Sequence, residues 1–385
     1  MSIFNSLGSN YNLRYVWKSL FSDYSGKGQK LKNFLEEKYF GKAILIYKGR
    51  EALTLVLKIL KLPKDSLVAI NGFTCFAVYR AIEEAELIPV CLDLESGNTD
   101  LNFTPEILEK ALKENANIKV VIVQNTFGYP ASMEKIRRIT REKNIILVED
   151  LAHCVGTVYE NGQEAGTIGD FATLSFSQDK VIDSVSGGAL IIINKKYFNE
   201  NKFQLETLGN RTKDKMYPLF THKIRFFYDS GIGKILHFAL KKLNFLSKPM
   251  EEGLYKLYSL PDWYCNLALM EFSKLVNQLD HRKEIAKIYS SKLNKRIFNA
   301  GMAKMIPASA NLRFPIFIEN RNNLIAFLKK ENIFVSDIWY DSVAPECPNA
   351  VDISTRILNL PTHINVSRKS AMRIADKINL WLKSQ

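Results

Sequence analysis

Cysteine is scarce in this sequence, and no two cysteines stand at metal-binding or redox spacing. The five present are Cys75, Cys91, Cys154, Cys265 and Cys347, and none belongs to a CxxC pair. An odd and scattered set argues against a disulfide framework and against a zinc site. We therefore expect a protein of a reducing compartment, the cytoplasm, without a bound metal.

Long apolar runs are lacking as well. No stretch approaches the ~18 uninterrupted apolar residues of a membrane span, and residues 1–6 lack the charged-then-apolar layout of a signal peptide. The 385 residues have an ordinary composition, 46% hydrophobic and 24% charged, which is typical of a folded protein. A chain of this length exceeds one typical domain, so a large domain and a smaller one are expected.

Acidic residues are outnumbered. The chain has 53 lysines and arginines against 40 aspartates and glutamates, which gives a net charge of +13. This excess suits nucleic acid, an acidic membrane surface or an anionic small substrate, and a lysine-rich coding bias would produce it without any function. The cations form no recognisable nucleic-acid reader motif, so nucleic acid is not expected as a partner.

The first two thirds of the chain alternate short apolar runs with amphipathic helical patterns. Near-continuous valine and isoleucine runs between helices indicate a mostly parallel sheet that is buried on both faces. The expected fold class is α/β, with a three-layer α/β/α large domain and a small C-terminal α+β domain. Ligands of such sheets gather at the carboxyl ends of the strands. The predicted strands cover residues 43–47, 66–70, 88–94, 118–123, 145–148, 171–176 and 189–193.

The remaining chain divides into two parts. We assign residues 1–212 to the large domain, 213–260 to a basic amphipathic connector, and 261–385 to a long helix, about Asn266–Leu293, with the small domain. Within the connector, Thr221–Lys248 interleaves large apolar side chains with six cations and one acid. Either this segment makes weak contact with an anionic membrane surface, or its apolar residues cover the large domain or a partner subunit. Its glycines argue against one continuous helix.

Two residues in the middle of the chain combine into a chemical signature. Asp150 ends a predicted strand, and Lys180 follows the next one; taken singly, a turn cap and a surface lysine explain them. Pyridoxal phosphate (PLP) catalysis, however, needs a lysine that holds the cofactor and moves protons, and a carboxylate that keeps the pyridine nitrogen protonated. It also needs a phosphate site, best formed where a glycine turn opens a helix, and Gly49 stands at such a turn.

Four short motifs surround these residues. They are Glu149–His153, Gly166–Asp170, Ser175–Lys180 and Gly187–Gly188. In order and composition they resemble the DegT/StrS-type family of sugar-nucleotide aminotransferases, which are PLP-dependent enzymes of fold type I. That family has Glu-Asp-Ala-Ala-His, Gly-x-x-Gly-Asp, Ser-Phe-x-x-x-Lys and Gly-Gly at these places. The resemblance extends over nearly the whole chain, and the retained lysine separates it from the family's dehydratase branch, which has histidine there.

The resemblance implies a role for each matched position. Lys180 would bind the cofactor covalently and carry protons, and Asp150 would pair with the pyridine nitrogen. His153 would lie near the ring and its phenolic oxygen. The phosphate would be held by Ser175 and by the backbone amides around Gly49 and Arg50.

Two positions, Cys75 and Arg50, depart from the family pattern, and His363 and Arg313 each have two possible roles. Cys75 replaces the aromatic residue that normally stacks on the cofactor, so either Phe76 substitutes for it or the stacking partner is lost. Arg50 takes the place of a threonine and would either reach an anion or pair with a neighbouring side chain. His363 would either approach the substrate or make a structural hydrogen bond. Arg313 would either bind the carboxylate of the amino donor or lie on the surface at a strand end.

We therefore expect a PLP-dependent aminotransferase. It would move an amino group from an amino acid, glutamate, to a keto group of a nucleotide-linked sugar in glycan or polysaccharide biosynthesis. The resemblance also implies a homodimer whose active sites are completed by the neighbouring chain. The alternative is a regulatory or scaffolding protein that binds PLP without turnover, and the retention of both Lys180 and Asp150 favours the enzyme.

Overall fold

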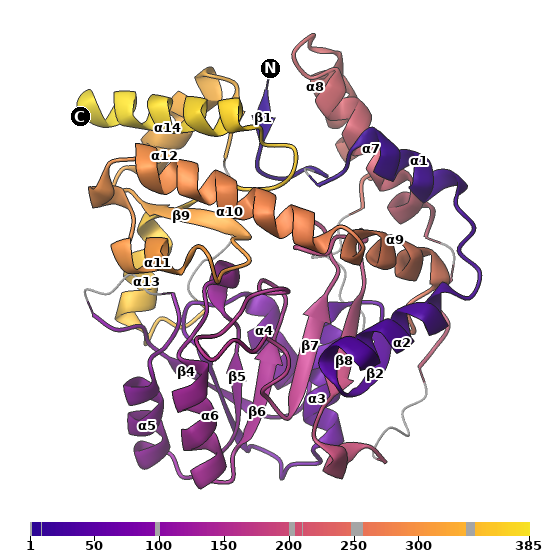
Figure 1. Ribbon diagram of the computed structural model, residues 1–385, viewed down its shortest axis with the longest axis vertical. Coiled ribbons are helices and arrows are strands. Elements are labelled where there is room, and N and C mark those ends of the chain that lie inside the picture. The colour runs from indigo at the N-terminus through magenta and orange to yellow at the C-terminus, as the bar shows by residue number, and fades with distance from the viewer. Residues whose placement is uncertain are drawn as a thin grey trace.

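A seven-stranded sheet forms the centre of the larger part of the molecule (Figure 1). The structure, a computed structural model, describes residues 2–8, 10–96, 101–199, 205–209, 211–247, 257–335 and 343–385. Within these residues the strand order is β2-β8-β7-β6-β5-β3-β4. β8 runs antiparallel to both of its neighbours, and the other pairs are parallel. The strands are β2 (Lys42–Ile46), β3 (Leu67–Asn71), β4 (Ile88–Leu92), β5 (Ile118–Val123), β6 (Ile146–Asp150), β7 (Phe171–Ser175) and β8 (Gly188–Ile192).

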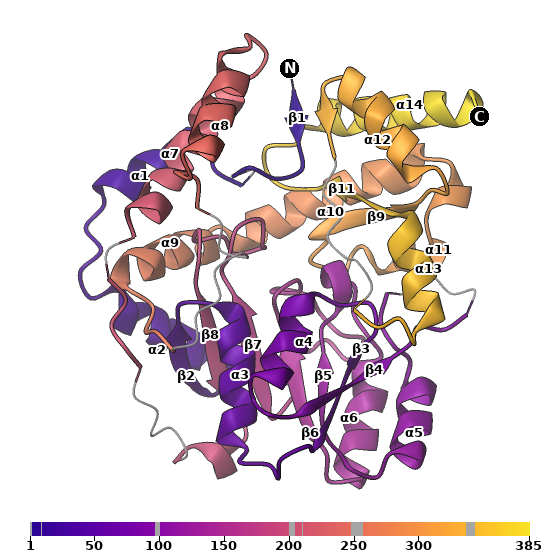
Figure 2. The same cartoon turned by 180° about the vertical axis from the view of Figure 1, so that it is seen from behind.

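Alternate side chains of these strands enter two separate apolar cores. In β5, Val120 and Ile122 pack into the core shared with α3 and α4, whereas Val121 and Val123 pack into the core shared with α2, α5 and α6. The sheet is therefore covered on both faces, and the predicted three-layer α/β/α arrangement is confirmed (Figures 1 and 2). The covering helices are α2 (Lys27–Tyr39), α3 (Gly49–Ile59), α4 (Phe76–Glu83), α5 (Pro105–Glu114) and α6 (Met133–Glu142).

The C-terminal part has a core of its own. Strands β9 (Arg313–Phe317) and β11 (Ile357–Pro361) pair antiparallel, and side chains from the helices pack with them. β1 (Ile3–Phe4) pairs in parallel with β10 (Ile333–Phe334), so the first described residues join the C-terminal core, which the sequence pattern did not indicate. The other helices here are α11 (Ala300–Met305), α12 (Arg321–Lys330), α13 (Pro348–Arg356) and α14 (Arg368–Lys383).

The predicted long helix over 266–293 is interrupted. It consists of α9 (Asp262–Phe272) and α10 (Leu275–Lys292). The interruption falls where the Ser273 hydroxyl donates a hydrogen bond to the Met270 carbonyl, 2.8 Å away, and where Lys274 leaves helical geometry with ψ near 1°. A serine that bonds back to the preceding turn competes with the helical ladder, which the apolar periodicity alone does not reveal.

The basic connector forms two helices, α7 (Thr212–Phe226) and α8 (Ile232–Lys242), as its glycines indicate. Gly231 caps α8 with φ +86°, a left-handed conformation that favours glycine. A Cβ on Gly233 would lie 2.2 Å from the Ile224 carbonyl, so the two helices pack closely there. Lys248, the last residue of the predicted basic segment, lies outside the described residues. No helix in the described part of the chain is both long and apolar enough to cross a membrane.

Candidate active site

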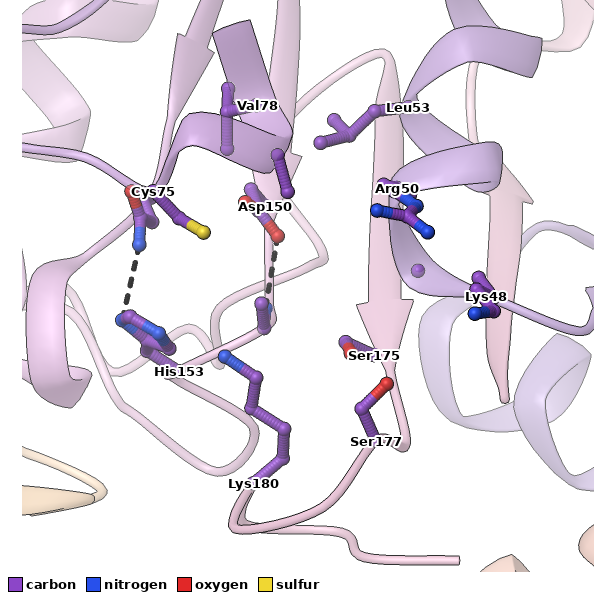
Figure 3. Close-up of a pocket in the computed structure, with 14 residues that line it drawn as sticks. Lys48, Arg50, Leu53, Cys75, Val78, Asp150, His153, Ser175, Ser177 and Lys180 are labelled. Carbon is purple, nitrogen blue, oxygen red and sulfur yellow. Dashed lines mark hydrogen bonds between the residues drawn. The ribbon is translucent and has the colours of Figure 1, made fainter. Parts of the chain in front are cut away.

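The carboxyl ends of β5, β6 and β7 and the start of α3 border one pocket (Figure 3). Parallel strands bring these ends to the same edge of the sheet, so residues far apart in the sequence meet there. Figure 3 shows the Lys180 side chain reaching between Asp150 and His153 on one side and Ser175 and Ser177 on the other. The lining residues are Lys48, Gly49, Arg50, Leu53, Cys75, Ala77, Val78, Gln124, Asp150, Ala152, His153, Ser175, Ser177 and Lys180.

Asp150 is the last residue of β6 and is buried. Burial raises the pKa of its carboxyl to about 6, against the lowering effects of the Ala152 amide and the Lys180 charge. The Ala152 N–H donates to Asp150 Oδ1 over 3.0 Å and fixes the carboxylate direction. At neutral pH the group is therefore a buried, oriented anion within reach of a cationic partner.

Lys180 lies in the loop that joins β7 to β8. Burial lowers the pKa of its amine, and Cys75 and Asp150 oppose that shift. The loop is held by Asp183, which accepts hydrogen bonds from the Tyr11 hydroxyl at 2.6 Å and the Asp179 amide at 2.9 Å. A lysine with a lowered pKa has a larger neutral fraction, which is the form that attacks a carbonyl carbon.

His153 is buried and held in one orientation. The Phe127 N–H donates to its Nδ1 over 3.3 Å, and Gln124 Nε2 lies 3.1 Å from the same nitrogen. Because a backbone N–H can only donate, Nδ1 is the acceptor and the ring proton resides on Nε2. Burial, with the Lys180 charge, holds the pKa of His153 well below its usual value, so the ring is neutral. The Thr74 hydroxyl in turn donates to Gln124 Oε1.

Gly49 opens α3 against the end of β7. A Cβ at this position would lie 2.7 Å from Ser175 Cβ, and a Cβ on Gly188 would lie 2.7 Å from Gly49 Cα. The helix start can approach the two strands this closely because both residues lack a side chain. The backbone N–H groups at the start of α3, with Arg50 and the Ser175 hydroxyl beside them in the pocket, form an arrangement that suits a phosphate group.

Replacing Gly49 with alanine is expected to weaken cofactor binding. Overpacking of this kind costs about 1–3 kcal/mol, which corresponds to roughly 5- to 150-fold in affinity, because α3 or Ser175 must move. Absorbance titration with PLP measures the loss. Gly209→Ala is the matched control, since a Cβ there meets nothing within 4 Å. Equal affinities for the two variants would contradict this role of Gly49.

Three residues named from the sequence do not line the pocket. Phe76 begins α4 with 53% of its surface exposed and stacks on Tyr79; Cys75 faces the pocket instead. The ring of His363 is buried and bonds through Nε2 to the Phe4 carbonyl at 2.8 Å. Arg313 is buried rather than at the surface, and donates to the Leu312 and Asn5 carbonyls at 3.0 Å each. Its charge still lowers the pKa values of His153 and Lys180.

Gln124 also lines the pocket, although it belongs to none of the sequence motifs. It stands directly after β5, as a polar side chain at the carboxyl end of a buried strand, which is the same signal that identified Asp150. Its contact with His153 links the residue after β5 to the segment after β6. Only the folded structure reveals this contact. Lys48, Cys75 and Ser177 line the pocket as well, and periodicity gives no sign of this.

Comparison with known proteins decides the family. The model of the DegT/DnrJ/EryC1/StrS aminotransferase family matches residues 13–379. The chain belongs to this family. The predicted family and enzyme class are thereby confirmed: the protein is a PLP-dependent aminotransferase.

Individual relatives of this DegT/DnrJ/EryC1/StrS aminotransferase are distant. GDP-perosamine synthase of Escherichia coli O157:H7 is 24% identical over 384 residues, which cover 95% of this chain and 94% of the relative. The structure of PseC from Helicobacter pylori, an aminotransferase involved in the biosynthesis of pseudoaminic acid, has a TM-score of 0.74 at 17% identity and covers 100% of both chains. Spr1654 of Streptococcus pneumoniae in its PLP form has a TM-score of 0.74 at 18% identity and covers 100% of this chain and 99% of that one. These structures show a shared fold.

The residues of the pocket fit PLP. An oriented, buried carboxylate suits the pyridine nitrogen, and a lysine of lowered pKa suits the aldehyde. A glycine-opened helix start with a serine hydroxyl suits the phosphate. The buried, neutral His153 lies with the carboxylate on the same side of Lys180 (Figure 3). When bound, the cofactor supplies a carbonyl carbon and a ring that accepts electrons.

Proposed function

We propose that this aminotransferase transfers the amino group of glutamate to a keto group of a nucleotide-linked sugar, in the cytoplasm, as a step of glycan or polysaccharide biosynthesis. The observation that carries the proposal is the meeting of Asp150, Lys180 and the Gly49 helix start in one pocket. The names of relatives point to the acceptor class: one is a GDP-perosamine synthase, and another is a transaminase of a UDP-linked altrosamine from Campylobacter jejuni. The cationic excess of the chain suits such anionic acceptors.

The proposal assigns roles to Lys180, to Asp150, to His153 and to the residues of the phosphate site. With the cofactor bound, the Lys180 amine would hold it covalently and would serve as the proton carrier of the reaction. The Asp150 carboxylate would keep the ring nitrogen protonated. His153, with its proton on Nε2, would act as a hydrogen-bond donor beside the ring. Ser175, Arg50 and the amides that follow Gly49 would hold the phosphate.

A spectroscopic experiment separates the enzyme from a PLP-binding protein without turnover. The absorbance band of the bound cofactor should bleach when glutamate is added, and return when a nucleotide-linked keto sugar follows. Amine transfer to a panel of such sugars, read by mass spectrometry, identifies the acceptor. A band that stays unchanged with glutamate and with other amino acids would favour the regulatory or scaffolding alternative.

We expect the protein to be a homodimer with its sites at the subunit interface, because fold type I sites are completed by the neighbouring chain. Light scattering at the concentration of the activity assay tests this. A monomeric mass together with full activity would contradict the dimer. The family's Asn-Tyr-Arg segment, which reaches the partner's site, is not recognisable at Pro261–Asn266. Cross-linking of the dimer identifies the residues that the neighbouring chain contributes.

A further inference from the structure

Helix α1 (Leu13–Phe21) is apolar on two faces. Tyr15 and Val16 are buried on the inner face. The outer face exposes Leu13, Trp17, Leu20 and Phe21, followed by Tyr24 after the helix; Trp17 is 65% exposed. A helix at the surface of a soluble protein normally carries polar residues on its outer face, so this stripe indicates a contact that the isolated chain does not make.

The α7–α8 hairpin also exposes large apolar side chains. Its exposed large apolar side chains lie on α8, at the end of α7 and just after α8, and Phe238, in the middle of α8, is 69% exposed. Scattered single exposed apolar residues are ordinary, whereas a contiguous group on neighbouring turns is not. The group consists of Phe226, Phe227, Ile232, Ile235, Phe238, Leu243 and Phe245.

These two elements, far apart in the sequence, lie together. Arg225 of α7 donates to the Tyr11 carbonyl, just before α1, over 2.6 Å, and the Tyr11 and Tyr217 rings meet edge to face at 6.1 Å. Figures 1 and 2 both show α1, α7 and α8 side by side at one end of the molecule, with α8 projecting beyond it. We call the exposed side chains of 13–24 and 223–245 the apolar–basic face.

The charges of this region have one predominant sign. Residues 13–24 and 221–247 together carry seven cations, Arg14, Lys18, Lys223, Arg225, Lys234, Lys241 and Lys242, against two acids, Asp23 and Asp229. Asp229 accepts hydrogen bonds from the Ser2 amide at 3.1 Å. Lys234, Lys241 and Lys242 are exposed on α8, the same helix as Ile235 and Phe238.

We infer that the apolar–basic face docks on an anionic phospholipid membrane. Its exposed aromatic and aliphatic side chains would enter the interface between head groups and acyl chains, and its lysines would meet the lipid phosphates. A second copy of the chain fits less well. A two-fold interface would bring two copies of this net-positive patch together, and interface cores are depleted in lysine.

The face is joined to the loop that carries the catalytic lysine. The Tyr15 hydroxyl of α1 donates to the Asp183 carbonyl over 2.8 Å, and Gln178 donates to the Ser247 carbonyl, after α8, over 3.3 Å. A membrane-docked molecule therefore holds its active-site loop in a defined relation to the membrane surface. This inference does not depend on the acceptor or on turnover.

Co-sedimentation of the full chain with vesicles tests the inference. Vesicles of phosphatidylcholine alone are compared with vesicles of phosphatidylcholine and phosphatidylglycerol, at low and at physiological salt. We expect binding to the anionic vesicles that weakens with salt, and much weaker binding to the neutral ones. Protein that stays in the supernatant with both vesicles at both salts, or that binds both vesicles equally, would overturn the inference.

Two double variants separate the apolar and basic contributions. Ile235→Ser with Phe238→Ser, and Lys241→Gln with Lys242→Gln, should each weaken binding by roughly an order of magnitude. The matched control is Lys110→Gln with Lys113→Gln on α5, which should bind as the wild type does. Unchanged binding in both test variants would contradict the inference. So would a light-scattering mass that falls from wild type to the Ile235 and Phe238 variant, because the face would then join two copies.

Discussion

Replacement of Lys180 by alanine is expected to abolish turnover while the protein remains folded. The side chain is half-buried in the pocket and lies between the Asp150 carboxylate and the hydroxyls of Ser175 and Ser177. Its removal takes away the amine that stands between Asp150 and the serines, where it would bind the cofactor covalently and move the proton. Loss of a general acid–base alone costs ~10²–10⁴-fold, and loss of the covalent link adds to this. Single-turnover absorbance with glutamate measures the effect.

The fold should survive because groups other than the Lys180 side chain anchor the loop. Its anchors are the Asp183 carboxylate and backbone, with the Asn10 amide donating to the Lys180 carbonyl at 3.2 Å. Circular dichroism and thermal melting check this directly. Lys287→Ala, an exposed lysine on α10, is the control and should keep full activity. Wild-type turnover in the Lys180 variant would show that another amine serves the cofactor.

Asp150→Asn is expected to retain the cofactor but to lower turnover by about 10²-fold or more. An amide cannot hold the ring nitrogen in its protonated form, so the developing negative charge loses its electrostatic partner. The wild type and the Asp150 variant should also differ in how their cofactor affinity depends on pH. Because the pKa of the wild-type carboxyl in the cofactor-free protein is about 6, its charge is present above that pH and is lost as the pH falls through it. Cofactor affinity of the wild type should therefore fall below pH 6 more steeply than that of the variant.

The control for this experiment is Asp280→Asn, which removes an exposed carboxylate on α10. It should leave the rate and the pH profile unchanged. Thermal melting of the cofactor-free proteins shows whether the Asp150 variant stays folded. If its rate equalled that of the wild type in the presence of saturating PLP, a different group would have to stabilise the ring.

The site motifs could be recognised from the sequence because the pocket is formed by residues at the ends of strands. Asp150 directly ends β6, Lys180 follows β7 in the next loop, and Gly49 opens the helix after β2, so short stretches of sequence already carried the chemistry. The α/β/α layering could also be predicted from the sequence. Strands that are buried on both faces are apolar at nearly every position, as β5 is over Val120–Val123. Sequence by itself thus determined the fold class and the cofactor, and it predicted the lysine and the carboxylate that meet in the pocket.

Only the tertiary structure decided which side chains complete the pocket. The contact between Gln124 and His153, and the burial of Arg313 and His363 away from the lining, depend on packing between segments far apart in the chain. The pairing of β1 with β10 and the joining of α1 to the α7–α8 hairpin depend on it as well. Periodicity along a chain reports which face of each element is apolar, but it does not report what that face meets. For α1 both faces are apolar, and only the folded chain shows that one is buried and the other exposed.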